Sequence, residues 1–337
     1  MNRSFPNVDS LVPALTEAYG PPGRETGIRA ALKRSLRGAG TPKEDALGNL
    51  RLHLPGRGPR LLLTAHMDAP GIIVTRVEAS GTGRLAILGT MAPSDWIGAM
   101  VLLDGNLRGL VGLDRPGDAK DGRDIEADAL FLDVGGGSAR RIRVGTVGAL
   151  EGRSVKLGDS WCAANLDNRA GCVALVAALR EARGFRYDVH VVFSAQSDLG
   201  GRGAATGTFG VEPDLAVVVD VAFTGESKGT GGIALGKGPC LGLKEQGFLA
   251  HPLMLELVKR AAKSARVKHQ WLIRESSGSD ARTVRASRGG VPTAVIAIPA
   301  RRTGGPCALL HAKDLNDTAT LVRQILKTPY PGEKGPR

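Results

Sequence analysis

Aromatic residues are scarce in this 337-residue chain, at 4%, although 42% of its residues are hydrophobic. A packed core must therefore be built mostly from Val, Leu, Ile and Ala. No apolar run approaches the roughly 18 residues that a membrane span requires. Residues 1–6 contain no apolar stretch of signal-peptide length. We therefore expect a cytoplasmic globular protein with no membrane partner.

Cysteine is also rare, and the four that occur are scattered without a C-x-x-C pair. This excludes a disulfide framework and a thiolate zinc site, and it fits free thiols in a reducing compartment. Neither H-E-x-x-H nor G-x-S-x-G occurs, so the common zinc-peptidase and serine-hydrolase signatures are missing. Residues 231–237 have phosphate-loop spacing, but Gly238 stands where that loop needs Ser or Thr.

Acidic residues are outnumbered by basic ones, which gives a formal net charge of +12. The basic residues are dispersed, and the densest clusters, 140–143 and 301–302, have no aromatics among them to stack bases. We interpret the charge as a solvated basic surface and expect no nucleic-acid partner. Attraction to acidic substrates remains the alternative.

The predicted secondary structure changes in character twice along the chain. A helix-rich start over 9–37, broken at 20–23, leads into two strands within 48–65. Short β-rich pieces with Gly-rich turns fill 73–160, after which helical and strand patterns alternate. The later elements are predicted at 170–183 (helix), 189–195 (strand), 215–219 (strand), 252–265 (helix) and 293–298 (strand).

Alternating strands and helices predict an α/β fold, with a largely parallel sheet flanked by helices. We expect the α/β domain to comprise 1–72 and 161–328, with a small β-rich domain of 73–160 inserted into it. The charged loop 115–127 should be the least ordered segment. A flexible tail is expected over 329–337, which contains three Pro and two Gly.

Polar residues recur at the ends of the apolar runs. His66 and Asp68 follow the run 61–63, and Asp220 follows 215–219. Open α/β sheets place ligands where their strands end, so one His and several Asp at such ends predict a metal site. Two further carboxylates occupy similar places: Asp167 and Asp198.

Each of these residues also has an ordinary structural explanation. His66 and Asp68 could be a surface pair, Asp167 could cap the helix that follows it, and Asp198 could stabilise a turn. Asp220 is the hardest to explain in this way, because a carboxylate at the end of a buried strand is costly unless it is paired or binds a cation.

The residues match a known family over about 9–325. The chain resembles the tetrahedral, glutamyl- and leucyl-type metallo-aminopeptidases, some of whose members are labelled cellulase or endoglucanase M. The matching segments are Leu15–Glu25, Gly48–Leu50, Ala65–Asp68, Leu166–Cys172, Gly278–Ala281, Gly290–Thr293 and Ile298-Pro299.

This resemblance implies a two-metal exopeptidase that removes N-terminal residues from peptides. It also implies a homo-oligomer, from a dimer formed through the β-rich insertion up to a dodecamer. By the resemblance, His66, Asp167 and Asp220 hold one divalent ion, Asp198 holds the second, and Asp68 orients His66. Zinc, cobalt and manganese are the expected metals.

Two positions depart from the family pattern. The family has Glu-Glu where this chain has Ser197-Asp198, and the first Glu is the general base. The family's second-metal His corresponds to Gly304. We therefore expect one bound ion and weakened catalysis. Cys307 or His311 could supply the missing ligand, and the alternative is an inactive relative that acts as a peptide-binding, metal-binding or assembly subunit.

Overall fold

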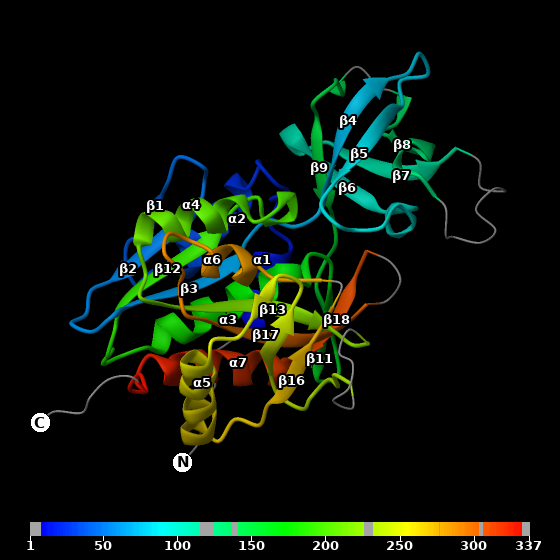
Figure 1. The fold of residues 1–337 in the computed structure, drawn as a ribbon. Helices are drawn as coiled ribbons and strands as arrows, with labels where there is room; N and C mark the ends of the chain where they lie inside the picture. The colour runs from blue at the N-terminus through cyan, green and yellow to red at the C-terminus, as the bar shows by residue number, and fades with distance from the viewer. Residues whose placement is uncertain are drawn as a thin grey trace, which may run out of the picture.

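The computed structural model describes residues 8–114, 125–136, 141–225, 232–275, 277–302 and 306–331. Within them, a large sheet covered by helices is joined to a small β-barrel that projects to one side (Figure 1). The helices are α1 (Val8–Thr16), α2 (Thr26–Ser35), α3 (Leu166–Glu181), α4 (Arg202–Val211), α5 (Pro252–Ala265), α6 (Ala281–Arg285) and α7 (Ala312–Ile325).

The large sheet has parallel strands at its centre and antiparallel strands at its margins. Its central strands are β12 (Asp188–Ser194), β3 (Arg60–His66), β13 (Leu215–Phe223) and β17 (Thr293–Arg302), in that order, and they pair in parallel. The marginal strands are β1 (Lys43–Glu44), β2 (Leu50–Leu54), β10 (Val155–Leu157), β11 (Ser160–Ala163), β14 (Cys240–Glu245), β15 (Phe248–Leu249), β16 (Gln270–Ile273) and β18 (Ala308–His311). The predicted α/β class is confirmed.

Both faces of the central strands are buried. Leu61 and Leu63 of β3 belong to the larger core, which includes side chains of α1, α2, α3, α5 and α7. Leu62 points the other way, into a smaller core with α4 and α6. This alternation follows from the two-residue period of a strand, and burial on both faces explains why β3 and β13 are continuous apolar runs.

The projecting barrel is closed and has its own core. Six strands form it in the order β4, β5, β8, β7, β6 and β9. Ile72, Val74, Trp96 and Val101 are among its buried side chains. The strands are β4 (Gly71–Val77), β5 (Gly83–Leu88), β6 (Met100–Leu103), β7 (Arg108–Leu113), β8 (Leu130–Asp133) and β9 (Val147–Leu150). The next two strands along the chain, β10 and β11, pair within the large sheet.

Most predicted elements occur within a few residues of their expected bounds, and the 252–265 helix coincides with α5. The pattern had not indicated β14, β16 or β18, which are short and mostly antiparallel. Most of the loop predicted to be least ordered, and most of the predicted tail, lie outside the described residues. No helix in the described part of the chain is both long and apolar enough to cross a membrane.

A buried arginine joins the start of α3 to the segment after α1. The Arg169 guanidinium is fully buried and donates to the carbonyl oxygens of Leu15, Ala18 and Gly20 at 2.9–3.1 Å. Burial lowers its pKa to about 10, so the group stays charged at neutral pH. A Cβ at Gly20 would lie 2.9 Å from an Arg169 nitrogen, which explains the glycine there.

Arg169→Ala should destabilise the protein by about 3–5 kcal/mol, because it leaves three carbonyl groups without their charged donor. Urea unfolding followed by circular dichroism measures the effect. Arg183→Ala is the matched control. Arg183 is exposed just beyond α3 and donates to the Arg180 and Ala182 carbonyls, which water can reach in its place, so its removal should cost less than about 1 kcal/mol. Equal stability losses for the two variants would contradict the anchoring role of Arg169.

Candidate metal centre

Three predicted residues converge at the carboxyl ends of the parallel strands. His66 is the last residue of β3, Asp220 lies in the neighbouring strand β13, and Asp167 lies in the first turn of α3. The Nε2 atom of His66 is 3.6 Å from Asp167 Oδ1 and 3.9 Å from Asp220 Oδ1. One ligand atom from each residue lies within 4.8 Å of the others. This spacing allows all three side chains to reach one ion.

The same cluster has unusual electrostatics. Burial, reinforced by the Asp167 carboxylate, raises the pKa of Asp220 to about 8. Burial acts to lower the pKa of His66, but Asp167 and Asp68 outweigh it and raise that pKa well above the usual value. Desolvation acts to raise the pKa of Asp167, yet His66 outweighs it and holds that pKa low. Acids packed this closely need protons or a cation to offset their repulsion.

Asp198 lies in the same pocket, outside the tight group of three. It belongs to the 3-10 turn η6 (Ser197–Leu199). Burial raises its pKa well above the usual value, and Asp68 adds to this effect. Its Oδ2 atom is buried and accepts no hydrogen bond from the described residues. A buried carboxylate oxygen that accepts no hydrogen bond is expected in a cation site, because the ion takes the place of the hydrogen-bond donor. The imidazole and carboxylates of this pocket therefore fit a divalent metal.

Asp68 supports two parts of the site at once. It is fully buried, and its two carboxylate oxygens accept the backbone N–H groups of Ser197 and Asp198 at 3.0 Å each. Its Oδ1 atom is 3.6 Å from His66 Nδ1, and the closer contact of that nitrogen, at 3.2 Å, is with the Asp68 backbone oxygen. Asp68 therefore fixes the η6 turn relative to the end of β3.

The start of α3 shows whether Asp167 caps the helix or is available as a metal ligand. The left-handed residue Asn165 precedes the helix, and no side chain caps it there. Instead, the Asn168 side chain accepts the backbone N–H of Gly171 at 3.1 Å and donates to the Val219 carbonyl at 2.8 Å. Asn168 thus performs the capping and ties α3 to β13. The Asp167 side chain is 43% exposed and lines the pocket.

Two buried charged residues beside the cluster were not singled out from the sequence. Arg274 lies 2.7 Å from Glu245 Oε1 and 3.9 Å from Asp220 Oδ2, and all three side chains are nearly inaccessible. Glu245 ends β14, and Arg274 follows β16. Each stands at the end of an apolar strand, which is the signal that had indicated Asp220. Arg274 supplies positive charge on the far side of Asp220 from His66.

Ser197 lies where the resemblance places a general base. Its hydroxyl donates to Asp280 Oδ1 at 2.7 Å, and the Ser194 hydroxyl donates to Asp280 Oδ2 at 2.8 Å. Asp280 is only 5% exposed. Together with His66, Asp167, Asp198 and Asp220, both Ser197 and Asp280 line a pocket of about 390 Å³. The Asp280 carboxylate therefore contacts Ser197, the position at which the sequence lacks the family's carboxylate.

The remaining predicted residues are those considered as a second-metal ligand or its replacement. Gly304 is outside the described residues. His311 ends β18 and caps α7, because its Nδ1 atom accepts the Lys313 backbone N–H at 3.1 Å. Cys307 is half-buried in a smaller neighbouring pocket that Asp167 also lines. Of the two candidate replacement ligands, Cys307 is the one beside a predicted ligand.

Asp68→Asn should lower the free energy of unfolding by about 1–3 kcal/mol. The amide nitrogen cannot accept a hydrogen bond, so one of the two backbone N–H groups at η6 loses its partner. Chemical denaturation in metal-free buffer measures the loss. Asp9→Asn is the control, because Asp9 forms only an exposed pair with Lys156 and should change stability by less than about 1 kcal/mol. Unaltered stability of Asp68→Asn would show that the carboxylate does not hold the turn.

Comparisons with known proteins identify the family. The sequence pattern of the M42 glutamyl aminopeptidase family matches residues 48–321. Lysyl aminopeptidase of Pyrococcus furiosus is 29% identical over 341 residues, covering 95% of this chain and 97% of the relative. A TET aminopeptidase from a marine sediment Thaumarchaeota archaeon superposes with a TM-score of 0.89 at 26% identity, covering 95% and 96% of the two chains.

A third comparison concerns assembly. The TET1 peptidase of Pyrococcus horikoshii superposes with a TM-score of 0.85 at 23% identity, covering 95% of this chain and 99% of that one. That peptidase can assemble into a tetrahedron or a large octahedral shell. At this identity the likeness shows a shared fold. The family match spans most of the chain, so this protein belongs to the M42 aminopeptidase family.

Proposed function

We propose that this protein is a metal-dependent aminopeptidase that removes N-terminal residues from peptides, with a slower chemical step than its relatives. The observation that carries the proposal is the convergence of His66, Asp167 and Asp220 in a pocket of about 390 Å³. The family's aminopeptidases are metal-dependent, and the donor set here, one imidazole and several carboxylates, suits zinc, cobalt or manganese.

In this proposal the residues divide into metal ligands and a positioning residue. His66, Asp167 and Asp220 hold one divalent ion, and Asp198 is the ligand available to a second. Asp68 orients His66 and keeps the η6 turn in place. When bound, the cation supplies Lewis-acid polarisation of the scissile carbonyl and lowers the pKa of a coordinated water. The protein residues supply the orientation and the path for the proton.

The chemical step should be slow because Ser197 replaces a carboxylate. A hydroxyl does not accept a proton at neutral pH, and the loss of a general base typically costs about 10²–10⁴-fold in rate. The hydrogen bond to Asp280 offsets part of this loss. As a water proton moves to Ser197 Oγ, the proton of Ser197 can move to Asp280 Oδ1, so Asp280 becomes the final acceptor.

Three arginine side chains, Arg274, Arg282 and Arg302, line the same pocket. Arg274 forms a buried ion pair with Glu245, whereas Arg282 and Arg302 are exposed. Their charge favours a substrate with an acidic side chain or a free carboxylate nearby. We therefore propose that glutamyl substrates are cleaved faster than lysyl ones.

We further propose a homo-oligomer, from a dimer up to a dodecamer, supported by the fold shared with the assembling TET1 peptidase. The projecting barrel offers Met100, Leu110 and Val144 as exposed apolar side chains for such contacts.

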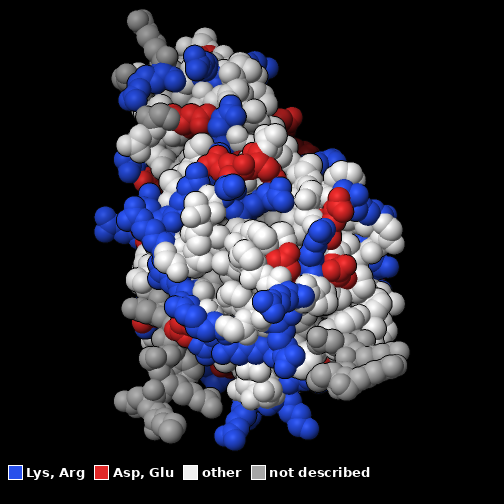
Figure 2. Space-filling model, turned by 90° about the vertical axis from the view of Figure 1, so that its left-hand side faces the viewer, with Lys and Arg blue, Asp and Glu red and all other residues white. Residues whose placement is uncertain are grey.

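On the face drawn in Figure 2, Lys and Arg are interspersed with acidic and uncharged residues, so the basic charge is spread over that face. A cytoplasmic location stays a prediction.

The purified protein with added zinc, cobalt or manganese should cleave aminoacyl chromogenic substrates, and chelation should abolish the activity. Asp220→Asn should lower kcat/KM by at least about 100-fold, because it removes a metal ligand. Glu256→Gln on the exposed side of α5 is the matched control and should keep full activity. Absence of cleavage across a panel that includes glutamyl and lysyl substrates would contradict the proposal.

Ser197→Glu combined with Gly304→His should raise kcat by about 10²-fold or more, because it restores the family's base and its second-metal ligand. Ser197→Ala is the control and should lower kcat below that of the unmodified protein, because it breaks the link to Asp280. If the unmodified protein is inert and the double variant is active, the chain is an inactive relative with an intact scaffold. If neither substitution changes kcat, these positions do not limit the reaction.

A further inference from the structure

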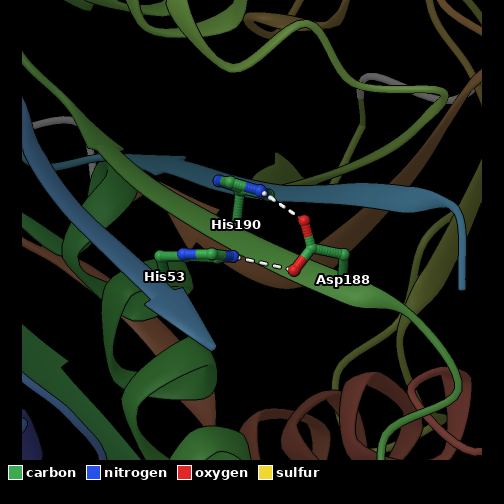
Figure 3. A group of neighbouring side chains, drawn as sticks. All are labelled: His53, Asp188 and His190. Carbon is green, nitrogen blue, oxygen red and sulfur yellow. Dashed lines mark hydrogen bonds and ion pairs between the residues drawn. The ribbon is translucent and has the colours of Figure 1, made fainter. Parts of the chain in front are cut away.

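A second group of potential metal ligands lies at the opposite end of the sheet. His53 of β2 is paired directly across from His190 of β12, and Asp188 precedes His190 by two residues. Because side chains alternate along a strand, all three lie on the same face, the one that packs against α4 (Figure 3). Asp188 begins β12 and pairs with Arg60, whereas the other end of β12 pairs with His66. The two groups are therefore roughly 20 Å apart along the strand.

The two imidazoles converge on one carboxylate. The Nε2 atom of His53 is 2.7 Å from Asp188 Oδ1, and that of His190 is 3.1 Å from Asp188 Oδ2 (Figure 3). The rings stack with centroids 4.2 Å apart and planes at 14°. The Gly56 backbone N–H also donates to Asp188 Oδ1, at 3.2 Å, which holds the carboxylate in place. The carboxylate is thus held between the two rings, with one Nε2 atom on each of its oxygens.

Binding an ion requires small changes in the N···O distances and a rotation of the stacked rings, because an imidazole binds a metal in its ring plane. Zinc–ligand bonds of about 2.0–2.1 Å in a tetrahedral site place the ligand atoms about 3.3 Å apart. The observed N···O separations of 2.7 and 3.1 Å would widen by a few tenths of an ångström as an ion replaces the shared protons. His53 is half exposed, so water can complete the coordination from the solvent side.

We propose that His53, Asp188 and His190 form a zinc-class metal site that joins strand β2 to strand β12. Two imidazoles and one carboxylate are typical ligands for Zn²⁺, Ni²⁺ or Cu²⁺, and they discriminate against Mg²⁺ and Ca²⁺, which prefer oxygen. The site is independent of the proposed peptidase function, because it shares no residue with the His66 group. Its role is to fasten the strand near the sheet margin rather than to perform chemistry.

The test uses the full-length Asp220→Asn protein, in which the His66 group has lost a ligand. After metal removal, calorimetric titration with ZnCl₂ should show one site per chain, and zinc should raise the melting temperature. His53→Gln in the same background should weaken zinc binding by at least 100-fold and abolish the thermal shift. His269→Gln is the matched control: it removes a half-buried histidine elsewhere and should leave both values unchanged.

Circular dichroism in metal-free buffer distinguishes a loss of zinc binding from a folding defect. Because His53 is half exposed, the His53→Gln variant should have the same melting temperature as its Asp220→Asn parent. His190→Gln provides a second, independent loss of binding. Zinc binding that survives both His→Gln substitutions, or an Asp220→Asn protein that binds no zinc, overturns the proposal. Neither result depends on whether the protein cleaves peptides, because activity is not measured.

Discussion

The organising constraint in this molecule is the crowding of acids at one edge of a parallel sheet. Asp220, Asp198 and Asp68 are buried or nearly so, and Asp167 joins them around the single imidazole of His66. Carboxylates this close repel one another and lose hydration, and both effects are unfavourable unless positive charge compensates. Arg274 supplies positive charge on one side, and protons or a bound cation can supply it on the other.

The surrounding framework holds those acids in place through polar contacts rather than through apolar packing alone. Asp68 clamps the η6 turn, Asn168 caps α3 and bonds to β13, and Arg169 anchors the same helix to the segment after α1. These contacts are buried, so each is costly to break. The site is consequently rigid, which is what a metal centre requires, because ligand atoms must be held close to their final positions.

Ser197 illustrates how one substitution acts on both charge and chemistry. A serine at this place removes one negative charge from an already crowded group and adds a donor to Asp280. The electrostatic repulsion falls, and so does the capacity to accept a proton. Such an exchange between stability and activity is common where catalysis depends on like charges held together. In this chain Asp280 is the carboxylate in direct contact with the Ser197 hydroxyl.

The sequence by itself determined the α/β class, the central strands and the four strand-end residues His66, Asp167, Asp198 and Asp220. It could do so because buried parallel strands are continuous apolar runs and the charged residues that end them stand out. Strands β14 and β16 are short, and polar residues interrupt or begin their apolar runs, so Glu245 and Arg274 were missed although each stands at a strand end. Only the tertiary structure decided which side chains meet: Asp280 beside Ser197 and His53 across from Asp188. Those pairs are 83 and 135 residues apart in the chain. The pairing of β2 with β12 brings the second pair together, and the packing of the η6 turn beside the start of α6 brings the first together.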